Sequence, residues 1–389
     1  MRERQILPLV VVALTGALVA VVALWTLDRV DSSQGDLTQN DALGLQSAPK
    51  VIEWKLVTTW PKGLPGLGAA PENFARRVNE ASGGRLRIKV FGAGEIVPAF
   101  EVFDAVSRGV AEAGHGASYY WKGKIPAAVF FTAVPFGMTA QEANGWLHYG
   151  GGLALWRELY APFGVIPYAG GSTGVQMAGW FNTRLNSRED LAGLKMRIPG
   201  LAGEVFDAAG GSAVRIAGGE VYTSMQTGVI DAVEWVGPFN DRTLGLMEVG
   251  DYYYYPGWHE PGAMLETIVN AEALAALPED LQAIVRIAAR ATNTDMLDDF
   301  TANNSESLQI LLRDFDTEVL PLPDDVMDAL YEQSQIAIQA LVDADPMAKK
   351  IAASYFAFSE KVRTYHEISE RAYLNGRDRL LPPVKLTAE

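Results

Sequence analysis

Strand-like and helix-like patterns of hydrophobic residues alternate along the chain from about residue 52 to residue 236. Segments 52–60 and 85–91 have strand composition, and segment 72–82 between them carries apolar residues at helical spacing. Helices alternating with strands are typical of crossover connections between parallel strands. The pattern therefore predicts an α/β fold with a mainly parallel sheet.

The last third of the chain has an almost wholly helical pattern, from residue 272 to residue 376. Residues 349–375 predict one long helix with an apolar stripe on roughly one face. The stripe consists of Tyr355, Phe358, Val362, Tyr365, Ile368 and Ala372. Two interpretations stay open: the stripe packs on the body of the same chain, or part of it packs against a second subunit and forms a homodimer.

The first 50 residues have a different character. An apolar run over 6–27 follows Arg2 and Arg4, and as a helix it is long enough to cross the roughly 30 Å hydrocarbon core of a membrane. We predict that residues 1–27 are either an uncleaved signal anchor or a long cleavable signal peptide, and that 28–50 form a polar tether. Both alternatives place the body, 51–389, in the periplasm, and the first would anchor it to the inner membrane.

Composition excludes several functional classes. The chain has 47 acidic and 32 basic residues, for a net charge of −15, so no nucleic-acid partner is expected. It has no Cys, which removes disulfides, thiolate metal sites and cysteine nucleophiles. No P-loop, G-x-S-x-G or H-E-x-x-H motif is present, and the four His residues have no metal-ligand spacing, so each is predicted to be structural or at the surface. We therefore predict that the protein is not an enzyme.

Arg197 and Gln176 stand out among apolar neighbours. Arg197 lies in the predicted strand 194–200, and its guanidinium offers two donors that match a carboxylate; the alternative is a salt bridge to a nearby acid. Gln176 lies in the predicted apolar strand 175–183, so its amide needs partners; the alternative is a core glutamine bonded to backbone groups.

Glu234 and Glu260 are carboxylates in apolar surroundings. Glu234 comes near the end of the predicted buried strand 228–235, and Glu260 lies in a segment with Trp258 and His259. A buried carboxylate is costly unless a cation or an arginine pairs with it. We predict that Arg197 clamps an organic acid while Glu234 and Glu260 hold a hard cation through oxygen ligands.

At these residues the chain resembles a known family. Four ordered segments carry the resemblance, which covers about 53–375: Trp54–Trp60, Phe91–Ile96, Lys195–Pro199 and Met225–Ala232. They are similar to segments of the DctP-like extracytoplasmic solute-binding proteins of TRAP transporters, and the site residues are most similar to the branch that receives 2-oxo acids or lactate with a metal ion.

The resemblance implies a fold and a function. The expected fold is two α/β lobes that close on ligand like a flytrap, with hinge strands and long C-terminal helices. Lobe I would comprise about 51–170 and 260–295, and lobe II about 171–259 with parts of the helices in 296–389. The implied function is binding of pyruvate, a longer 2-oxo monocarboxylate or lactate together with sodium or calcium, and delivery to the TRAP permease in the membrane.

The resemblance also implies roles for individual residues. Arg197 would pair with the substrate carboxylate, with Gln176 beside it. Glu234, the Trp235 backbone and Glu260 would hold the cation, with Gln176 as a further ligand and the Trp235 side chain at the substrate. The predicted aromatic walls of the pocket are Trp60, Tyr119, Tyr120 and Phe181. Two other functions stay open: a membrane-tethered ligand sensor, and an enzyme with Glu234 as general base.

Overall fold

The computed structural model describes residues 51–315, 317–382 and 386. The predicted signal segment, 1–27, and tether, 28–50, lie outside the described residues. Residues from Val51 onward belong to one compact unit. Among the described residues, no helix is both long enough and apolar enough to span a bilayer.

The first sheet has five strands in the order β2-β1-β3-β10-β4. Strand β1 is parallel to both β2 and β3, whereas β10 is antiparallel to both β3 and β4. The strands are β1 (Ile52–Thr58), β2 (Leu86–Phe91), β3 (Ala113–Gly116), β4 (Val165–Ser172) and β10 (Met264–Asn270). Helix α2 (Ala69–Ala81) connects β1 to β2, and α3 (Val102–Ser107) lies between β2 and β3.

The second sheet has six strands in the order β11-β9-β5-β8-β6-β7. Strand β6 is parallel to β7 and β8, and β9 is parallel to β11, but β5 is antiparallel to both of its neighbours. The strands are β5 (Gly179–Phe181), β6 (Lys195–Arg197), β7 (Ser212–Val214), β8 (Ala232–Val233), β9 (Tyr252–Tyr255) and β11 (Glu318–Pro321).

The α/β prediction is confirmed, but both sheets are mixed rather than mainly parallel. Strands β5 and β10 cause the difference, because loops rather than helices lead into them and allow them to enter antiparallel. The predicted strand over 175–183 is also much shorter: only Gly179–Phe181 pairs, and Gln176 lies in the loop before it.

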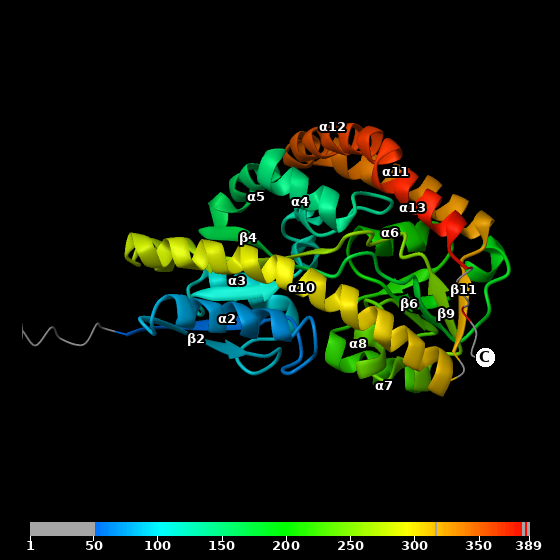
Figure 1. Cartoon of the computed structure of the whole chain (residues 1–389), viewed down its shortest axis with the longest axis horizontal. Helices are drawn as coiled ribbons and strands as arrows, with labels where there is room; N and C mark the ends of the chain where they lie inside the picture. The colour runs from blue at the N-terminus through cyan, green and yellow to red at the C-terminus, as the bar shows by residue number, and fades with distance from the viewer. Residues whose placement is uncertain (1–50, 316, 383–385, 387–389) are drawn as a thin grey trace, which may run out of the picture. The chain divides into compact units, whose positions relative to one another are not determined.

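Helix α10 (Glu279–Asp314) packs along both sheet regions. It contacts β4 and α2 beside the first sheet and α8 (Pro238–Thr243) beside the second (Figure 1). Shorter helices cover the sheets and their connections. They are α4 (Ala140–Tyr149), α5 (Gly152–Tyr160), α6 (Gly200–Ala208), α7 (Val221–Gln226) and α9 (Ala271–Ala275).

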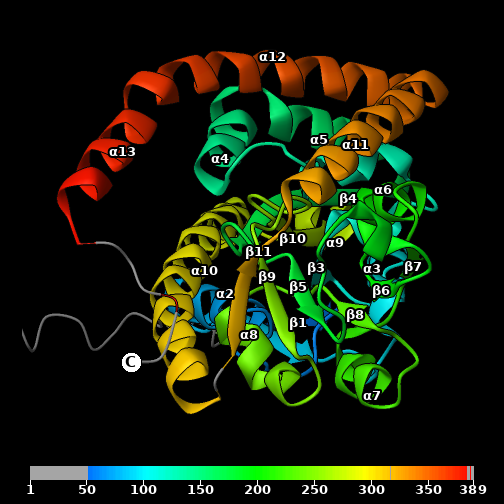
Figure 2. The ribbon, with the colours of Figure 1, turned by 90° about the vertical axis from the view of Figure 1, so that its right-hand side faces the viewer.

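The C-terminal helices are α11 (Asp324–Ala344), α12 (Pro346–Ile368) and α13 (Glu370–Leu380). The single helix predicted for 349–375 is therefore wrong, because the backbone at Ser369 leaves the helical region with φ −113° and ψ −99°. Figure 2 shows α12 running over α4 and α5, which it contacts.

The apolar stripe on α12 divides into a buried and an exposed part. Tyr355 is buried and stacks edge-on against Trp146, so this part of the stripe packs on the same chain. Tyr365 and Ile368 are 64% and 77% exposed. The buried part agrees with packing on the body of the same chain, and the exposed part leaves packing against a second subunit open.

Candidate solute-binding site

Adjacent strand ends bring Arg197 and Glu234 together. Arg197 is the last residue of β6, and Glu234 directly follows β8, the parallel neighbour in which Val233 is the register partner of Arg197. The carboxyl ends of parallel strands commonly form ligand sites because their side chains and loops meet at one edge.

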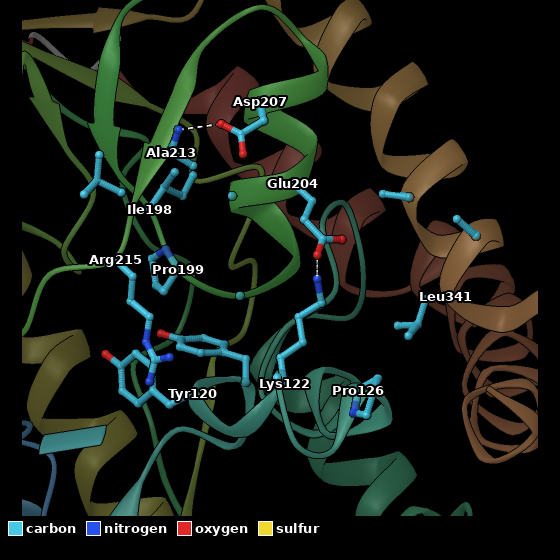
Figure 3. Close-up of a pocket in the computed structure, with 17 residues that line it drawn as sticks. Tyr120, Lys122, Pro126, Ile198, Pro199, Glu204, Asp207, Ala213, Arg215 and Leu341 are labelled. Carbon is cyan, nitrogen blue, oxygen red and sulfur yellow. Dashed lines mark hydrogen bonds and ion pairs between the residues drawn. The ribbon is translucent and has the colours of Figure 1, made fainter. Parts of the chain in front are cut away.

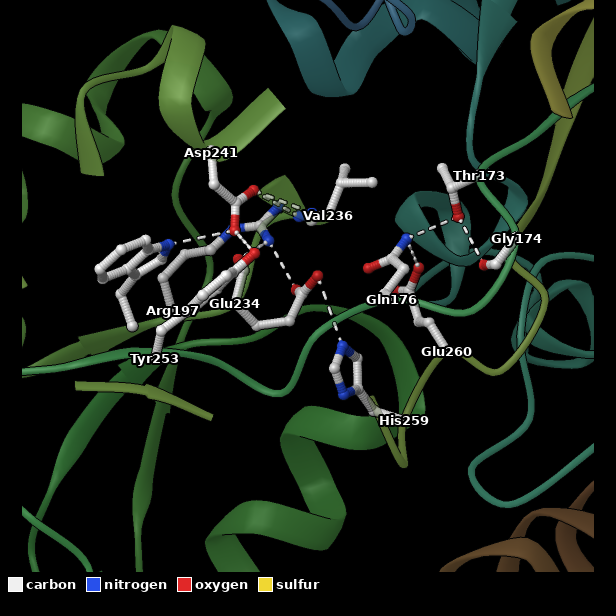
Figure 4. Close-up of polar contacts among 12 residues, drawn as sticks. Thr173, Gly174, Gln176, Arg197, Glu234, Val236, Asp241, Tyr253, His259 and Glu260 are labelled. Atoms are coloured by element: carbon white, nitrogen blue, oxygen red, sulfur yellow. Dashed lines mark hydrogen bonds and ion pairs between the residues drawn. The ribbon is translucent and has the colours of Figure 1, made fainter. Parts of the chain in front are cut away.

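The guanidinium of Arg197 forms an ion pair with Glu234 inside the protein. Its Nη1 donates to Oε2 of Glu234 at 2.8 Å and to the Glu234 carbonyl oxygen at 2.5 Å (Figure 4). Arg197 and Glu234 are only 2% and 1% exposed. The guanidinium lies 4.8 Å from the centre of the Trp235 ring, and Nη2 makes only a long, 3.4 Å contact with the hydroxyl of Tyr120. Nη2 is thus the nitrogen best placed to receive a further acceptor.

Gln176 and Glu260 meet through two loops. Glu260 lies between β9 and β10, and its carbonyl oxygen accepts a hydrogen bond from the Gln176 backbone N–H at 3.2 Å. The amide Nε2 of Gln176 donates to Oε2 of Glu260 at 2.7 Å and to the hydroxyl of Thr173 at 3.1 Å (Figure 4). The side-chain carbonyl Oε1 of Gln176 has no donor among the described residues.

Glu234, His259 and Glu260 form a buried cluster of potential metal ligands. One ligand atom from each lies within 4.8 Å of the others, and Nε2 of His259 is 3.4 Å from Oε1 of Glu234. Within the described part of the chain, neither Oε1 of Glu234 nor either ring nitrogen of His259 has a hydrogen-bond partner. Because buried polar atoms are normally paired, these atoms fit an additional ligand. The carboxylate and amide oxygens suit a hard cation such as sodium or calcium.

Burial changes the proton affinity of all three cluster residues. It raises the pKa of Glu234 to about 7, although the charge of Arg197 opposes the shift. Burial, reinforced by the charge of Glu234, raises the pKa of Glu260 to about 8. Burial lowers the pKa of His259 to about 4, so the imidazole is neutral and able to act as a ligand at pH 7.

A small cavity lies beside Arg197, Gln176 and Glu260. Trp60, Tyr119, Tyr120 and Trp235 form its aromatic walls, and Thr173, Leu67, Val236 and Leu265 complete the lining. Its free volume is about 10 Å³, roughly the space that one water molecule needs. A ligand of several heavy atoms therefore requires movement of the surrounding side chains or lobes.

Among the described residues, Phe181 is the only predicted wall residue that does not line the small cavity. It belongs to β5, is buried in the core of the second sheet, and packs edge-on against Tyr254 with ring centres 5.2 Å apart. The position of Phe181 in the predicted strand indicates a buried side chain, but it does not show on which face of the sheet that side chain lies.

Sequence reasoning missed two residues of the site region. His259 was predicted to be structural or at the surface, but the loop conformation directs its ring toward Glu234. Asp241, on α8, accepts hydrogen bonds from the backbone N–H groups of Val236 and Gly237 at 3.1 and 3.0 Å. Neither residue has a sequence motif that marks it.

Asp241 holds the segment that follows Glu234 and Trp235. Its second oxygen accepts from the indole of Trp180 at 3.2 Å and from the hydroxyl of Tyr253 at 2.8 Å (Figure 4). Burial raises its pKa to about 7 despite these donors. Two of these four hydrogen bonds come from the turn after Trp235 and two from side chains of β5 and β9, so the buried carboxyl group ties the turn to the second sheet.

A larger cavity of about 650 Å³ adjoins the aromatic wall. Tyr119 and Tyr120 line both cavities, and Arg215 lines the larger one (Figure 3). The guanidinium of Arg215 lies 3.8 Å from the centre of the Phe100 ring. Lys122 and Glu204 form an ion pair across this cavity, between the segment after Trp121 and helix α6.

Comparison with known proteins identifies the family. Residues 56–345 match the family described as DctP, bacterial extracellular solute-binding protein, family 7. The chain belongs to the DctP family. This confirms the resemblance found in the sequence, and it places the protein among extracellular solute-binding proteins.

Close relatives agree with this assignment. A monocarboxylate 2-oxoacid-binding periplasmic protein of Nostoc is 41% identical over 338 residues, which cover 87% of this chain and 92% of that protein. A TRAP periplasmic solute-binding protein of Colwellia psychrerythraea, with bound calcium and pyruvate, is 41% identical with a TM-score of 0.82, covering 84% of this chain and 100% of that one. Its counterpart from Pseudoalteromonas atlantica, with bound sodium and pyruvate, has the same identity and TM-score and covers 84% and 99%.

These structures confirm the predicted fold class, an α/β periplasmic-binding-protein fold with long C-terminal helices. The division into lobes at particular residues stays a prediction. The relatives are DctP-family solute-binding proteins, and two of them bind a 2-oxo acid together with a cation.

Proposed function

We propose that this DctP-family protein is the receptor of a TRAP transporter for a small 2-oxo monocarboxylate, or for lactate, bound with sodium or calcium. The observation that carries the proposal is the buried guanidinium of Arg197, paired with Glu234, beside a small aromatic-walled cavity that Gln176 and Glu260 also line. The relatives that bind pyruvate with calcium or sodium support the same ligand class.

The charges of the site explain why a cation is needed. Arg197 carries one positive charge, and the carboxylate of Glu234 already neutralises part of it through the 2.8 Å ion pair. Once Glu234 and Glu260 are ionised, above their pKa values of about 7 and about 8, an anionic substrate next to them would therefore face net repulsion in a low-dielectric site. A bound cation would reverse this balance and supply a second positive centre for the substrate oxygens.

Every predicted site residue except Phe181 has a role in this proposal. Nη2 of Arg197 contacts the substrate carboxylate, and the amide of Gln176 lies beside it. Glu234, Glu260 and the Trp235 backbone hold the cation, with Oε1 of Gln176 as a further oxygen ligand. His259 is an additional candidate, because its neutral ring faces Glu234. Trp60, Tyr119, Tyr120 and the Trp235 side chain limit the size of the substrate.

In this proposal the protein delivers its ligand without catalysing a reaction on it. The receptor would close on its ligand in the periplasm, release it to the TRAP membrane permease, and leave every bond of the ligand intact. Retention of the full chain in the membrane fraction would show that residues 1–27 remain as an anchor, and release in soluble form would show that they are removed.

We also propose that the exposed end of the C-terminal stripe forms a homodimer interface. Tyr365 and Ile368, near the end of α12, are 64% and 77% exposed, so two large side chains of the stripe are not covered by this chain. Sedimentation of Ile368→Glu as a monomer, with the wild type as a dimer, is the expected outcome. A wild-type monomer would contradict this part of the proposal.

A thermal-shift screen tests the main proposal. The protein is first chelated, and calcium or sodium is then added. Pyruvate, a longer 2-oxo acid and lactate should each be compared with acetate, which lacks the 2-oxo or 2-hydroxy oxygen. A ligand at 100 times its Kd adds about 2.7 kcal/mol to the folded state. We expect the shift with 2-oxo or 2-hydroxy acids and not with acetate, and no turnover of the bound acid. Equal shifts with acetate, or consumption of the acid, would contradict the proposal.

A further inference from the structure

Another cavity, apart from the two described above, is lined by three arginine side chains and by no acidic side chain. It has a volume of about 510 Å³ and is lined by residues of α4, α5, β4 and α10, including Arg157, Arg286 and Arg290. A neighbouring cavity of about 480 Å³ shares Arg157, Arg286 and Tyr168 with it. Neither cavity shares a lining residue with the small cavity at Arg197.

The three guanidinium groups have no counter-charge within the described residues. No carboxylate lies within 4.0 Å of Arg157, Arg286 or Arg290 there, although many of the chain's other arginines do form ion pairs. The chain has 47 acidic residues against 32 basic ones, so a cationic cluster without an acidic neighbour runs against its overall charge.

The arrangement is unfavourable for the empty protein. Arg286 and Arg290 are four residues apart on α10, where like charges destabilise a helix. Arg157 comes from α5, and its guanidinium lies 5.5 Å from the centre of the Tyr168 ring on β4, which holds it toward the cavity. Places where a protein breaks such a local rule are often functional.

The remaining lining adds a buried polar atom and an apolar wall. Nε2 of His148 is buried without a partner among the described residues, and burial together with the charges of Arg290 and Arg157 lowers the pKa of this ring. Leu153, Ala169 and Ile287 supply the apolar wall, and Ile287 is 64% exposed. A concave, largely apolar site with a few convergent polar groups is typical of small-molecule binding.

We propose that this cavity, defined by Arg157, Arg286 and Arg290, binds the phosphate group of an organic phosphate. Arginine forks match phosphate oxygens in pairs, and a doubly charged group balances three guanidiniums better than a monocarboxylate does. The apolar wall would contact the organic part of the ligand. The phosphate can be carried by a soluble monoester or by a lipid with a monoester headgroup such as phosphatidic acid, since both present the same three oxygens.

Calorimetric titration of the full chain in non-ionic detergent tests this proposal. The two probes are phenyl phosphate and dihexanoyl phosphatidic acid below its micelle concentration. Arg286→Gln/Arg290→Gln is the test variant, and Arg87→Gln/Arg108→Gln, which removes two exposed arginines outside both cavities, is the matched control.

We expect the wild type and the control to bind at least one probe, and the test variant to bind at least about tenfold more weakly. Binding of phenyl phosphate would indicate a soluble phosphate, and binding of the lipid alone would indicate a headgroup. Failure of both probes to bind the wild type, or equal binding by the test variant, would overturn the proposal. Without ligand, the test variant should melt no lower than the wild type, because it loses a repulsion; a lower melting temperature would contradict the account of Arg286 and Arg290.

Discussion

One nitrogen of Arg197, Nη1, donates to both the side-chain and the main-chain oxygen of Glu234. The pair therefore fixes the end of β6 to the end of β8 as well as balancing two buried charges. It also leaves the other terminal nitrogen, Nη2, toward the hydroxyl of Tyr120 and the small cavity. Arg197 is thus both part of the protein's internal support and the candidate partner of the substrate.

Arg197→Gln should destabilise the protein strongly. The substitution leaves Glu234 as a buried carboxylate without its cation, which costs about 3–5 kcal/mol. Urea unfolding of the wild type and variant, both free of ligand, measures the difference.

The double variant Arg197→Gln/Glu234→Gln is the control for this first prediction. Because it removes both charges, it should lose less stability than the sum of the two single variants. Strict additivity would show that the 2.8 Å ion pair contributes no coupling energy.

Glu260→Gln should abolish most of the stabilisation by calcium. The residue loses the charge that we assign to cation binding, while the hydrogen bond from Gln176 can still be accepted by the new amide oxygen. The melting temperature should be compared with and without calcium at a fixed pyruvate concentration.

Glu266→Gln is the matched control for Glu260→Gln. Glu266 is equally buried, but its oxygens accept from the indole of Trp121 at 2.5 Å and the hydroxyl of Tyr160 at 2.9 Å. This variant should keep the calcium-dependent shift even if it is less stable. Loss of the shift in Glu266→Gln alone would place the cation elsewhere.

Stability and cation binding should depend on pH in opposite directions. The pKa values of Glu234 and Glu260 are raised to about 7 and about 8, above the ordinary value of 4.5. Between pH 5 and 8 the folded state therefore binds more protons than the unfolded state, so their contribution to the stability of the ligand-free protein falls as pH rises.

A cation binds the deprotonated carboxylates and gains affinity over the same range. The thermal shift caused by calcium should therefore grow from pH 5.5 to pH 8, while the melting temperature without calcium declines through these two groups. A calcium shift that is constant across this range would mean that neither carboxyl group titrates at the site.

Asp241→Asn should weaken both the fold and ligand binding. Each oxygen of Asp241 accepts hydrogen bonds from two donors. In the asparagine variant an NH₂ group would replace one of these oxygens and would face two donors instead of accepting from them. An unsatisfied buried donor costs about 1–3 kcal/mol. Chemical unfolding measures that loss, and a titration with pyruvate and calcium measures the displacement of the Trp235 turn.

Tyr253→Phe removes only one of the four donors to Asp241 and serves as the comparison. It should be less destabilising than Asp241→Asn and should change ligand affinity less. Equal effects of the two variants would show that the turn does not depend on the backbone bonds of Asp241.

The sequence predicted the candidate site better than the details of the fold. Arg197 and Glu234 converge because each lies at or just after a strand end, and adjacent parallel strands end at the same edge. Gln176 joins Glu260 through loop contacts that no periodicity encodes. Their shared feature in the sequence is a polar side chain in an apolar segment, which requires a partner once buried.

Other features could not be predicted because they depend on tertiary contacts. The antiparallel entry of β10 follows from the path of the loop before it, and its continuous apolar sequence is compatible with either direction. His259 is directed to Glu234 by a loop, and Asp241 reaches Val236 and Gly237 from α8. The break at Ser369 interrupts a segment whose residues all permit a helix.

Calorimetric titration of pyruvate into the chelated protein, before and after calcium is restored, measures whether the substrate needs the cation in order to bind. At about pH 9, above the pKa values of about 7 and about 8 of Glu234 and Glu260, we expect no measurable binding without a cation and saturable binding with calcium or sodium, because the two carboxylates repel the substrate until a cation is held between them. Pyruvate binding of equal affinity with and without the cation would contradict this expectation.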